Sequence, residues 1–116
     1  PFGRTKAKVS EIICKKLENA GVTVDKCMGV EPHYTDENSE FVQSLNRVYE
    51  RITGKKGGCI TIGGGTYVHE IEGGVAFGAE YEGGSGNMHG ADEFITEESL
   101  LLNAEIMAEA IKEICG

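Results

Sequence analysis

The chain has 116 residues, of which 40% are hydrophobic, enough for one domain with a modest core. Its 11 basic and 19 acidic residues give a formal net charge of −8. This balance disfavours binding to nucleic acid or to an anionic membrane surface, because both require basic patches. No apolar run approaches the length that spans a bilayer, and no signal peptide is recognisable. We therefore predict a cytoplasmic chain.

The first thirty residues predict a helix followed by a strand. Apolar residues recur at helical spacing over 5–20, and Gly21 is well placed to end that helix. Residues 22–30 alternate between apolar and polar, as in a strand with one face in solvent. Pro32 then breaks the pattern, because proline has no N–H to donate and suits an extended connector. We place a domain boundary just before it.

Residues 39–53 predict a second helix, which Gly54 ends. Two short runs that are bounded by glycines, 59–62 and 74–78, predict strands. Residues 66–71 fit neither pattern. The plausible N-caps of the helix are Asp36, Asn38 and Ser39, and its apolar stripe is Phe41, Leu45, Val48, Tyr49 and Ile52.

Residues 97–115 predict the last helix, with Thr96 as its N-cap. Ile106 and Ala110 lie off its main apolar stripe, so we expect this helix to be buried on more than one side. That main stripe consists of Leu100, Leu101, Ala104, Met107, Ala108, Ile111 and Cys115.

The four cysteines form no C-x-x-C pair, and their spacing does not suit a Cys-rich zinc site. We expect free, buried thiols in a reducing compartment. They are Cys14, Cys27, Cys59 and Cys115.

His89 is the first candidate for chemistry. It follows a glycine-rich loop at 83–87 and has Glu93 four residues further on, so it suits a metal ligand or an acid–base group. Spacing alone favours an ordinary loop histidine, because one histidine does not make a site. The same ordinary interpretation applies to His33 and His69.

The glycine run 63–65 with Thr66 is the second candidate. Its backbone N–H groups could cradle an anion, although it lacks the glycine spacing of a dinucleotide fold and the lysine of a P-loop. A turn that approaches a substrate backbone and a purely structural turn fit equally well.

The chain contains four distinctive phrases in this order: GGGTY at 63–67, VAFG at 75–78, HGADEFI at 89–95 and EIMAEAI at 105–111. Together they resemble the C-terminus of the dinuclear zinc peptidases. This family includes aminoacylase, carnosinase, acetylornithine deacetylase and succinyl-diaminopimelate desuccinylase, and the resemblance is closest to its bacterial dipeptidase V branch. It extends upstream to 32–34 and 48–54, where His33 replaces a leucine of the branch; His69 stands where relatives often carry arginine.

The resemblance implies an α/β fold with two domains. Residues 1–31 would form the end of a smaller lid domain, with Pro1-Phe2-Gly3 continuing one of its strands. Residues 32–116 would form the C-terminal part of the catalytic domain. On this reading the chain is a fragment, and its unpaired strand edges and apolar faces lead us to expect self-association.

The resemblance also implies the site. Of the family's metal ligands only the last, a histidine, falls in this chain, at His89, with Asp92 or Glu93 as the partner of its second ring nitrogen. Gly64, Gly65 and Thr66 would face the substrate. Family members use two zinc ions, with Mn or Co as possible substitutes, and a glutamate that is absent from this chain takes the proton of the attacking water.

We therefore expect part of a metal-dependent dipeptidase that hydrolyses dipeptides with a free carboxylate, and an isolated chain without activity. One alternative is a deacylase of N-acyl amino acids, of the acetylornithine deacetylase or succinyl-diaminopimelate desuccinylase type. The other is a stand-alone module that binds an anion or a nucleotide at residues 63–66.

Overall fold

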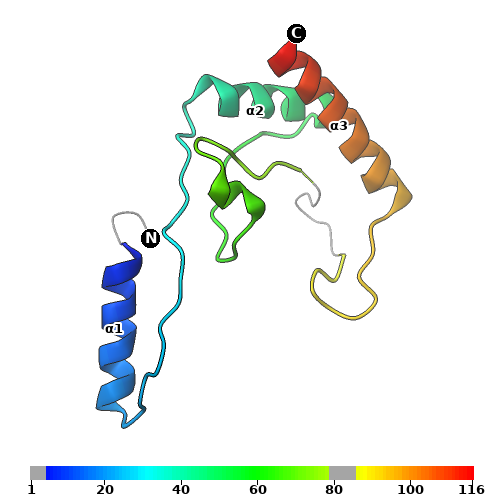
Figure 1. Cartoon of the computed structure of the whole chain (residues 1–116). Coiled ribbons are helices and arrows are strands. Elements are labelled where there is room, and N and C mark those ends of the chain that lie inside the picture. Colours follow the sequence, from blue (N-terminus) through cyan, green and yellow to red (C-terminus); the bar gives the residue numbers. More distant parts are fainter. Residues whose placement is uncertain (1–4, 79–85) are drawn as a thin grey trace. The chain divides into compact units, whose positions relative to one another are not determined.

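The computed structural model describes residues 5–78 and 86–116, and its regular elements there are all helical (Figure 1). The expected lid-strand phrase at residues 1–3 and the first part of the glycine loop, 83–85, lie outside the described residues. The three predicted helices are confirmed to within one residue at each end. The elements are α1 (Lys6–Asn19), α2 (Glu40–Thr53), the 3₁₀ helix η1 (Tyr67–Glu70) and α3 (Glu97–Cys115).

The chain divides into two compact units, Pro1–Tyr34 and Thr35–Gly116, which we call the N-terminal unit and the C-terminal unit. The boundary expected from the sequence lies three residues earlier, before Pro32. Whether the two sides correspond to a lid domain and a catalytic domain stays a prediction.

In the N-terminal unit, Thr5 caps the start of α1, because its hydroxyl accepts a hydrogen bond from the Lys8 N–H. It ends in a turn where Gly21 has a φ of 78°, a conformation that glycine adopts without strain. The chain then returns beside α1 as an extended segment, residues 22–31 (Figure 1). The predicted strand at 22–30 is wrong, because a strand needs a hydrogen-bonded neighbour and the described part of the chain offers it none.

The predicted strands at 59–62 and 74–78 do not form either. Ile60 is 88% exposed, so the first segment lies open to solvent. In the second segment, side chains alternate between the core and solvent although no strand hydrogen bonds form. Val75 and Phe77 pack on the core, while Ala76 between them is exposed. The α/β two-domain fold therefore stays a prediction for the longer protein.

The core of the C-terminal unit lies where α2 packs on α3. Val48 of α2 and Ile106 of α3 are fully buried, and they meet Leu45 and Ala110 in one cluster. The partly buried residues around this cluster are Tyr49, Ile52, Val75, Phe77 and Leu102.

We expected α3 to be buried on more than one side, but among the described residues only one of its sides is buried. Ile106 and Ala110, which lie off the main apolar stripe, are the buried residues of this helix. Leu101 and Ile111, which belong to the stripe, are 62% and 63% exposed. The reason is geometric: α2 covers the narrower face, and no described element covers the broader one.

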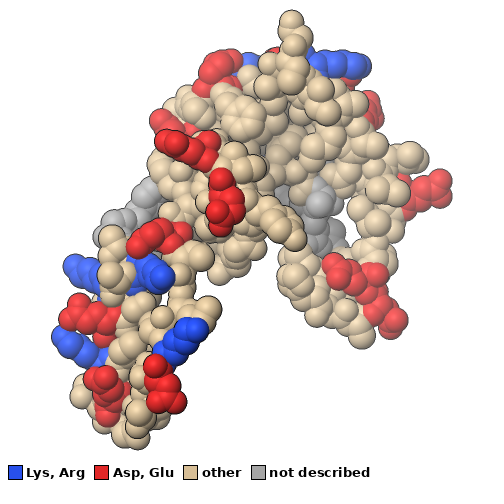
Figure 2. Space-filling view, viewed as in Figure 1, with Lys and Arg blue, Asp and Glu red and all other residues tan. Residues whose placement is uncertain are grey.

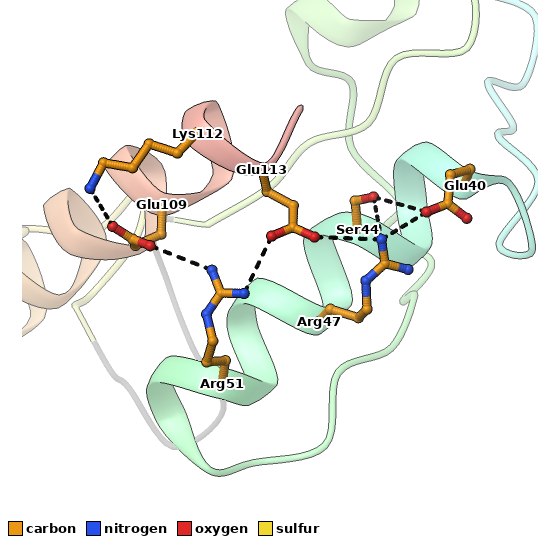
Figure 3. Close-up of polar contacts among 7 residues, drawn as sticks. All are labelled: Glu40, Ser44, Arg47, Arg51, Glu109, Lys112 and Glu113. Atoms are coloured by element: carbon orange, nitrogen blue, oxygen red, sulfur yellow. Dashed lines mark hydrogen bonds and ion pairs between the residues drawn. The ribbon is translucent and has the colours of Figure 1, made fainter. Parts of the chain in front are cut away.

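Two arginines on α2 face two glutamates on α3 along the edge of this interface (Figure 3). The Arg51 guanidinium lies 3.5 Å from the Glu109 carboxylate and 3.3 Å from that of Glu113. Arg47 lies 3.6 Å from Glu113 and 2.7 Å from Glu40 on its own helix. All of these groups are at least partly exposed, so each ion pair adds little to stability.

Charges of both signs are mixed on the surface. On the face that Figure 2 shows, lysine and arginine side chains are interspersed with acidic ones over α1. Among the described residues, no helix is both long and apolar enough to cross a membrane.

The solvent exposure of the cysteines contradicts another expectation. We predicted buried thiols, yet Cys27, Cys59 and Cys115 are exposed and Cys14 is only half-buried. The predicted strands that would have covered Cys27 and Cys59 do not form.

Candidate functional site

The segment 86–94, which we call the His89 loop, is closed by its own backbone. The N–H of Phe94 donates to the carbonyl of Gly86 at 3.0 Å, and inside the loop the N–H of Gly90 donates to the carbonyl of Asn87 at 2.6 Å. A side chain could not replace the glycine at the start, because a Cβ on Gly86 would lie 2.5 Å from the Phe94 carbonyl oxygen. The hydrogen bond between Gly86 and Phe94 thus holds the two ends of the loop together just before α3 begins at Glu97.

Three non-glycine residues of this loop have left-handed backbone conformations. Asn87, His89 and Asp92 have φ angles of 55°, 62° and 55°. Asn, Asp and His tolerate this region better than other residues, but each still costs of the order of 1 kcal/mol or more. Strain of this kind concentrates at functional sites, so the backbone of the loop supports a functional role for His89.

The His89 imidazole is exposed, and no hydrogen bond joins it to Asp92 or Glu93 within the part of the chain that the structure describes. Such a ring can approach a ligand from outside the loop. A zinc ion needs about four protein or water ligands. Over residues 5–78 and 86–116, no group of three or more His, Cys, Asp or Glu side chains is placed to hold a metal. The described residues therefore do not make up a zinc site by themselves.

The glycine turn at 63–66 leads into η1. Gly64, Gly65 and Thr66 are all exposed. Thr66 caps the short helix: its hydroxyl accepts from the Val68 N–H at 3.1 Å, and its carbonyl accepts from the His69 N–H at 3.2 Å. The turn is therefore built around Thr66.

His69 completes this cap. Its Nδ1 lies 3.3 Å from the Thr66 backbone nitrogen and 3.1 Å from the Thr66 carbonyl oxygen, so it accepts from the first when unprotonated and donates to the second when protonated. The Thr66 N–H thus points at His69. Glu70 also lines the shallow depression beside the turn, together with Gly65 and Tyr67. A carboxylate and an occupied N–H both disfavour an anion here, which weakens the nucleotide-binding alternative.

Sequence reasoning missed two features of these segments. It treated His69 as an ordinary histidine, although this side chain takes the place that Glu or Gln has in a capping box, three residues after the Thr. It also missed the left-handed backbone of the His89 loop. The signal was the succession of Asn, His and Asp next to glycines, since these residue types enter that region most readily.

Comparison with known proteins gives the family. The sequence pattern of peptidase family M20/M25/M40 matches residues 4–113, which is nearly the whole chain.

Individual relatives agree with this match. A beta-Ala-Xaa dipeptidase of Lactobacillus delbrueckii subsp. lactis is 50% identical over 84 residues, which are 72% of this chain and 18% of the relative. A candidate dipeptidase of Staphylococcus haemolyticus is 38% identical over 87% of this chain and 22% of its own length. One of Staphylococcus aureus is 35% identical over 99% of this chain and 24% of its own length. The chain thus spans about a quarter of these relatives or less.

Proposed function

Because this chain belongs to peptidase family M20/M25/M40, we propose that it is part of a metal-dependent dipeptidase that hydrolyses dipeptides with a free carboxylate. The observation that carries the proposal is the family match over residues 4–113, together with a relative that is 50% identical and named as a beta-Ala-Xaa dipeptidase. We place this enzyme in the cytoplasm.

In this proposal the two units have different tasks. Residues 1–31 end a lid domain, and residues 32–116 form the C-terminal part of a catalytic domain whose remaining segments lie outside this chain. The division of the chain into two compact units near this point supports the assignment. The relatives are roughly four to six times as long as the matched region, which leaves room for those segments.

His89 is the residue of this chain that we assign to the metal. Its support is the closed loop, the strained backbone and the exposed ring. A metal-bound imidazole is neutral and gives one nitrogen to the ion, while the other nitrogen needs a partner that fixes the tautomer. Asp92 or Glu93 can take that role after a side-chain rotation, since both lie on the same loop.

The cofactor is proposed as two zinc ions, which Mn or Co can replace. When bound, such ions lower the pKa of a water molecule and polarise the scissile carbonyl. The other ligands and the general base belong to the longer polypeptide. We therefore expect the isolated chain to be inactive.

Gly64, Gly65 and Thr66 are proposed to face the dipeptide. Two of the three positions carry no side chain, and all three are exposed, so a substrate backbone can approach closely. The His69 contact holds the turn in one conformation.

The alternative within the family is a deacylase of N-acyl amino acids. The names of the matched relatives favour the dipeptidase. A panel of dipeptides and of N-acetyl and N-succinyl amino acids, tested on the full-length enzyme, separates the two by which series is turned over.

The test of the site is His89→Ala in the full-length enzyme, with metal content and dipeptide turnover measured side by side. We expect one of the two metals to be lost or weakened and most turnover to disappear, while circular dichroism stays unchanged because a loop side chain carries little of the core. His33→Ala is the matched control, since it removes a histidine outside the loop. A His89→Ala enzyme with both metals and near-normal turnover would refute the assignment.

A further inference from the structure

The N-terminal unit places two cysteines side by side. The extended segment 22–31 is held against α1 near both of its ends. The Val22 N–H donates to the Leu17 carbonyl at 3.0 Å, and the Lys6 N–H donates to the Glu31 carboxylate at 2.9 Å. Cys27 lies between these two points on the segment, and Cys14 lies between them on the helix. The topology therefore brings residues 13 positions apart onto facing elements.

Solvent exposure shows which side of α1 the segment covers. Val9, Ser10 and Cys14 are the half-buried residues of the helix, and they lie on one side of it. On the segment, Val24 is half-buried in turn, and Gly29 lies against the Lys6 stem, where an added Cβ would be 3.6 Å from the Lys6 Cγ. Cys14 thus sits on the covered side.

The Cys27 thiol lies near enough to affect the pKa of the Cys14 thiol. Partial burial, and after it a hydrogen bond with the Cys27 thiol, raises the pKa of the Cys14 thiol. Neither cysteine is bonded to another sulfur in this structure, and Cys27 is exposed to solvent. Cys27 is accordingly the sulfur that a small oxidant reaches first.

We propose that Cys14 and Cys27 form a redox-active pair, which a peroxide converts to an intramolecular disulfide that clamps segment 22–31 to α1. In the first step the Cys27 thiolate attacks one peroxide oxygen, the O–O bond breaks, and the products are a sulfenic acid and water once the released oxygen takes up a proton. In the second step the Cys14 sulfur attacks the Cys27 sulfur, the S–O bond breaks, and a second water leaves. Two thiols lose two electrons in total, and the peroxide gains them.

A covalent link would matter in this unit because α1 has no fully buried residue. The exposed fractions of Ile12, Ile13 and Leu17 are 37%, 49% and 38%, so apolar packing does little to hold the segment in place. A disulfide between residues 14 and 27 closes a short loop and restricts the unfolded ensemble, as in small domains that lack a core.

Peptide mapping of the full chain tests the proposal. Trypsin cleaves after Lys15 and Lys26, so Cys14 and Cys27 fall in different peptides, 9–15 and 27–47. After treatment with hydrogen peroxide and alkylation of the remaining thiols, we expect these two peptides to appear as one disulfide-linked species that a reductant separates. At micromolar protein the internal link should outcompete links between copies by on the order of a thousandfold.

Three variants complete the experiment. Cys14→Ser and Cys27→Ser should each abolish the linked species, whereas Cys59→Ser removes an exposed thiol of the other unit and should leave its yield unchanged. The wild-type map does not depend on how any variant folds. The proposal is overturned if both thiols remain open to alkylation after peroxide, if the links run to Cys59 or Cys115, or if the yield rises with protein concentration.

Discussion

Ile106→Ala tests which face of α3 carries the core of the C-terminal unit. Ile106 is fully buried and contacts the cluster of Leu45, Val48 and Ala110. The substitution deletes three carbon atoms, worth about 0.8 kcal/mol each in transfer free energy, and leaves a cavity that adds to the cost. We expect the free energy of unfolding to fall by about 3 kcal/mol.

That loss is large for this unit. Only five apolar side chains are buried among the described residues, so its stability should lie near the lower end of the usual range, at about 5 kcal/mol. Urea denaturation followed by circular dichroism measures the change. With a slope of about 2 kcal/mol per molar, the midpoint should fall by roughly 1.5 M.

The matched control is Ile111→Ala on the same helix. Ile111 is 63% exposed on the broader apolar face, so the same chemical change should alter the free energy of unfolding by less than about 0.5 kcal/mol. Both variants are measured at low micromolar concentration, where association contributes least. Equal losses in the two variants, or a larger loss for Ile111→Ala, would refute the assignment of the buried face.

Three further predictions concern charge, association and metal. The hydrogen bond and charge of Arg47 hold the pKa of Glu40 below its ordinary 4.5. The stability that this pair provides is therefore present above pH 4.5 and is lost as the pH falls through the lowered pKa of Glu40. The urea midpoint should drop below pH 4.5, and it should drop less in Arg47→Met. The exposed face of α3 should drive self-association, which sedimentation detects and Leu101→Glu reduces; a monomer at high concentration would contradict this. Zinc should bind the isolated chain only weakly by calorimetry, and His89→Ala should weaken it further; tight binding would show a site that the described residues do not contain.

Local sequence determined the helices and their ends. Ser39 and Thr96 cap α2 and α3 through hydrogen bonds to the N–H groups three residues on, and Gly54 ends α2 with a φ of 68°. These contacts lie within a few residues along the chain, so the residue types suffice to predict them. The order of short phrases likewise pointed to the family that the match over residues 4–113 establishes.

The candidate site was predictable only in part. The place of His89 between a glycine loop and a helix made it a candidate, and the family resemblance, not the spacing, assigned it to a metal. Its left-handed backbone and the Gly86–Phe94 closure are properties of the folded loop. The contact between Thr66 and His69 could not be predicted from the sequence either, because it forms only when η1 forms.

Tertiary structure decided what periodicity left open. An apolar stripe predicts that a helix has a face to bury, but only its partner decides which face that is, and α2 covers Ile106 rather than Ile111. Alternation likewise predicts that 22–30 is extended, yet a strand exists only when a neighbour supplies its hydrogen bonds. The pairing of Cys14 with Cys27 has the same origin, because it arises when the chain turns at Gly21 and runs back along α1.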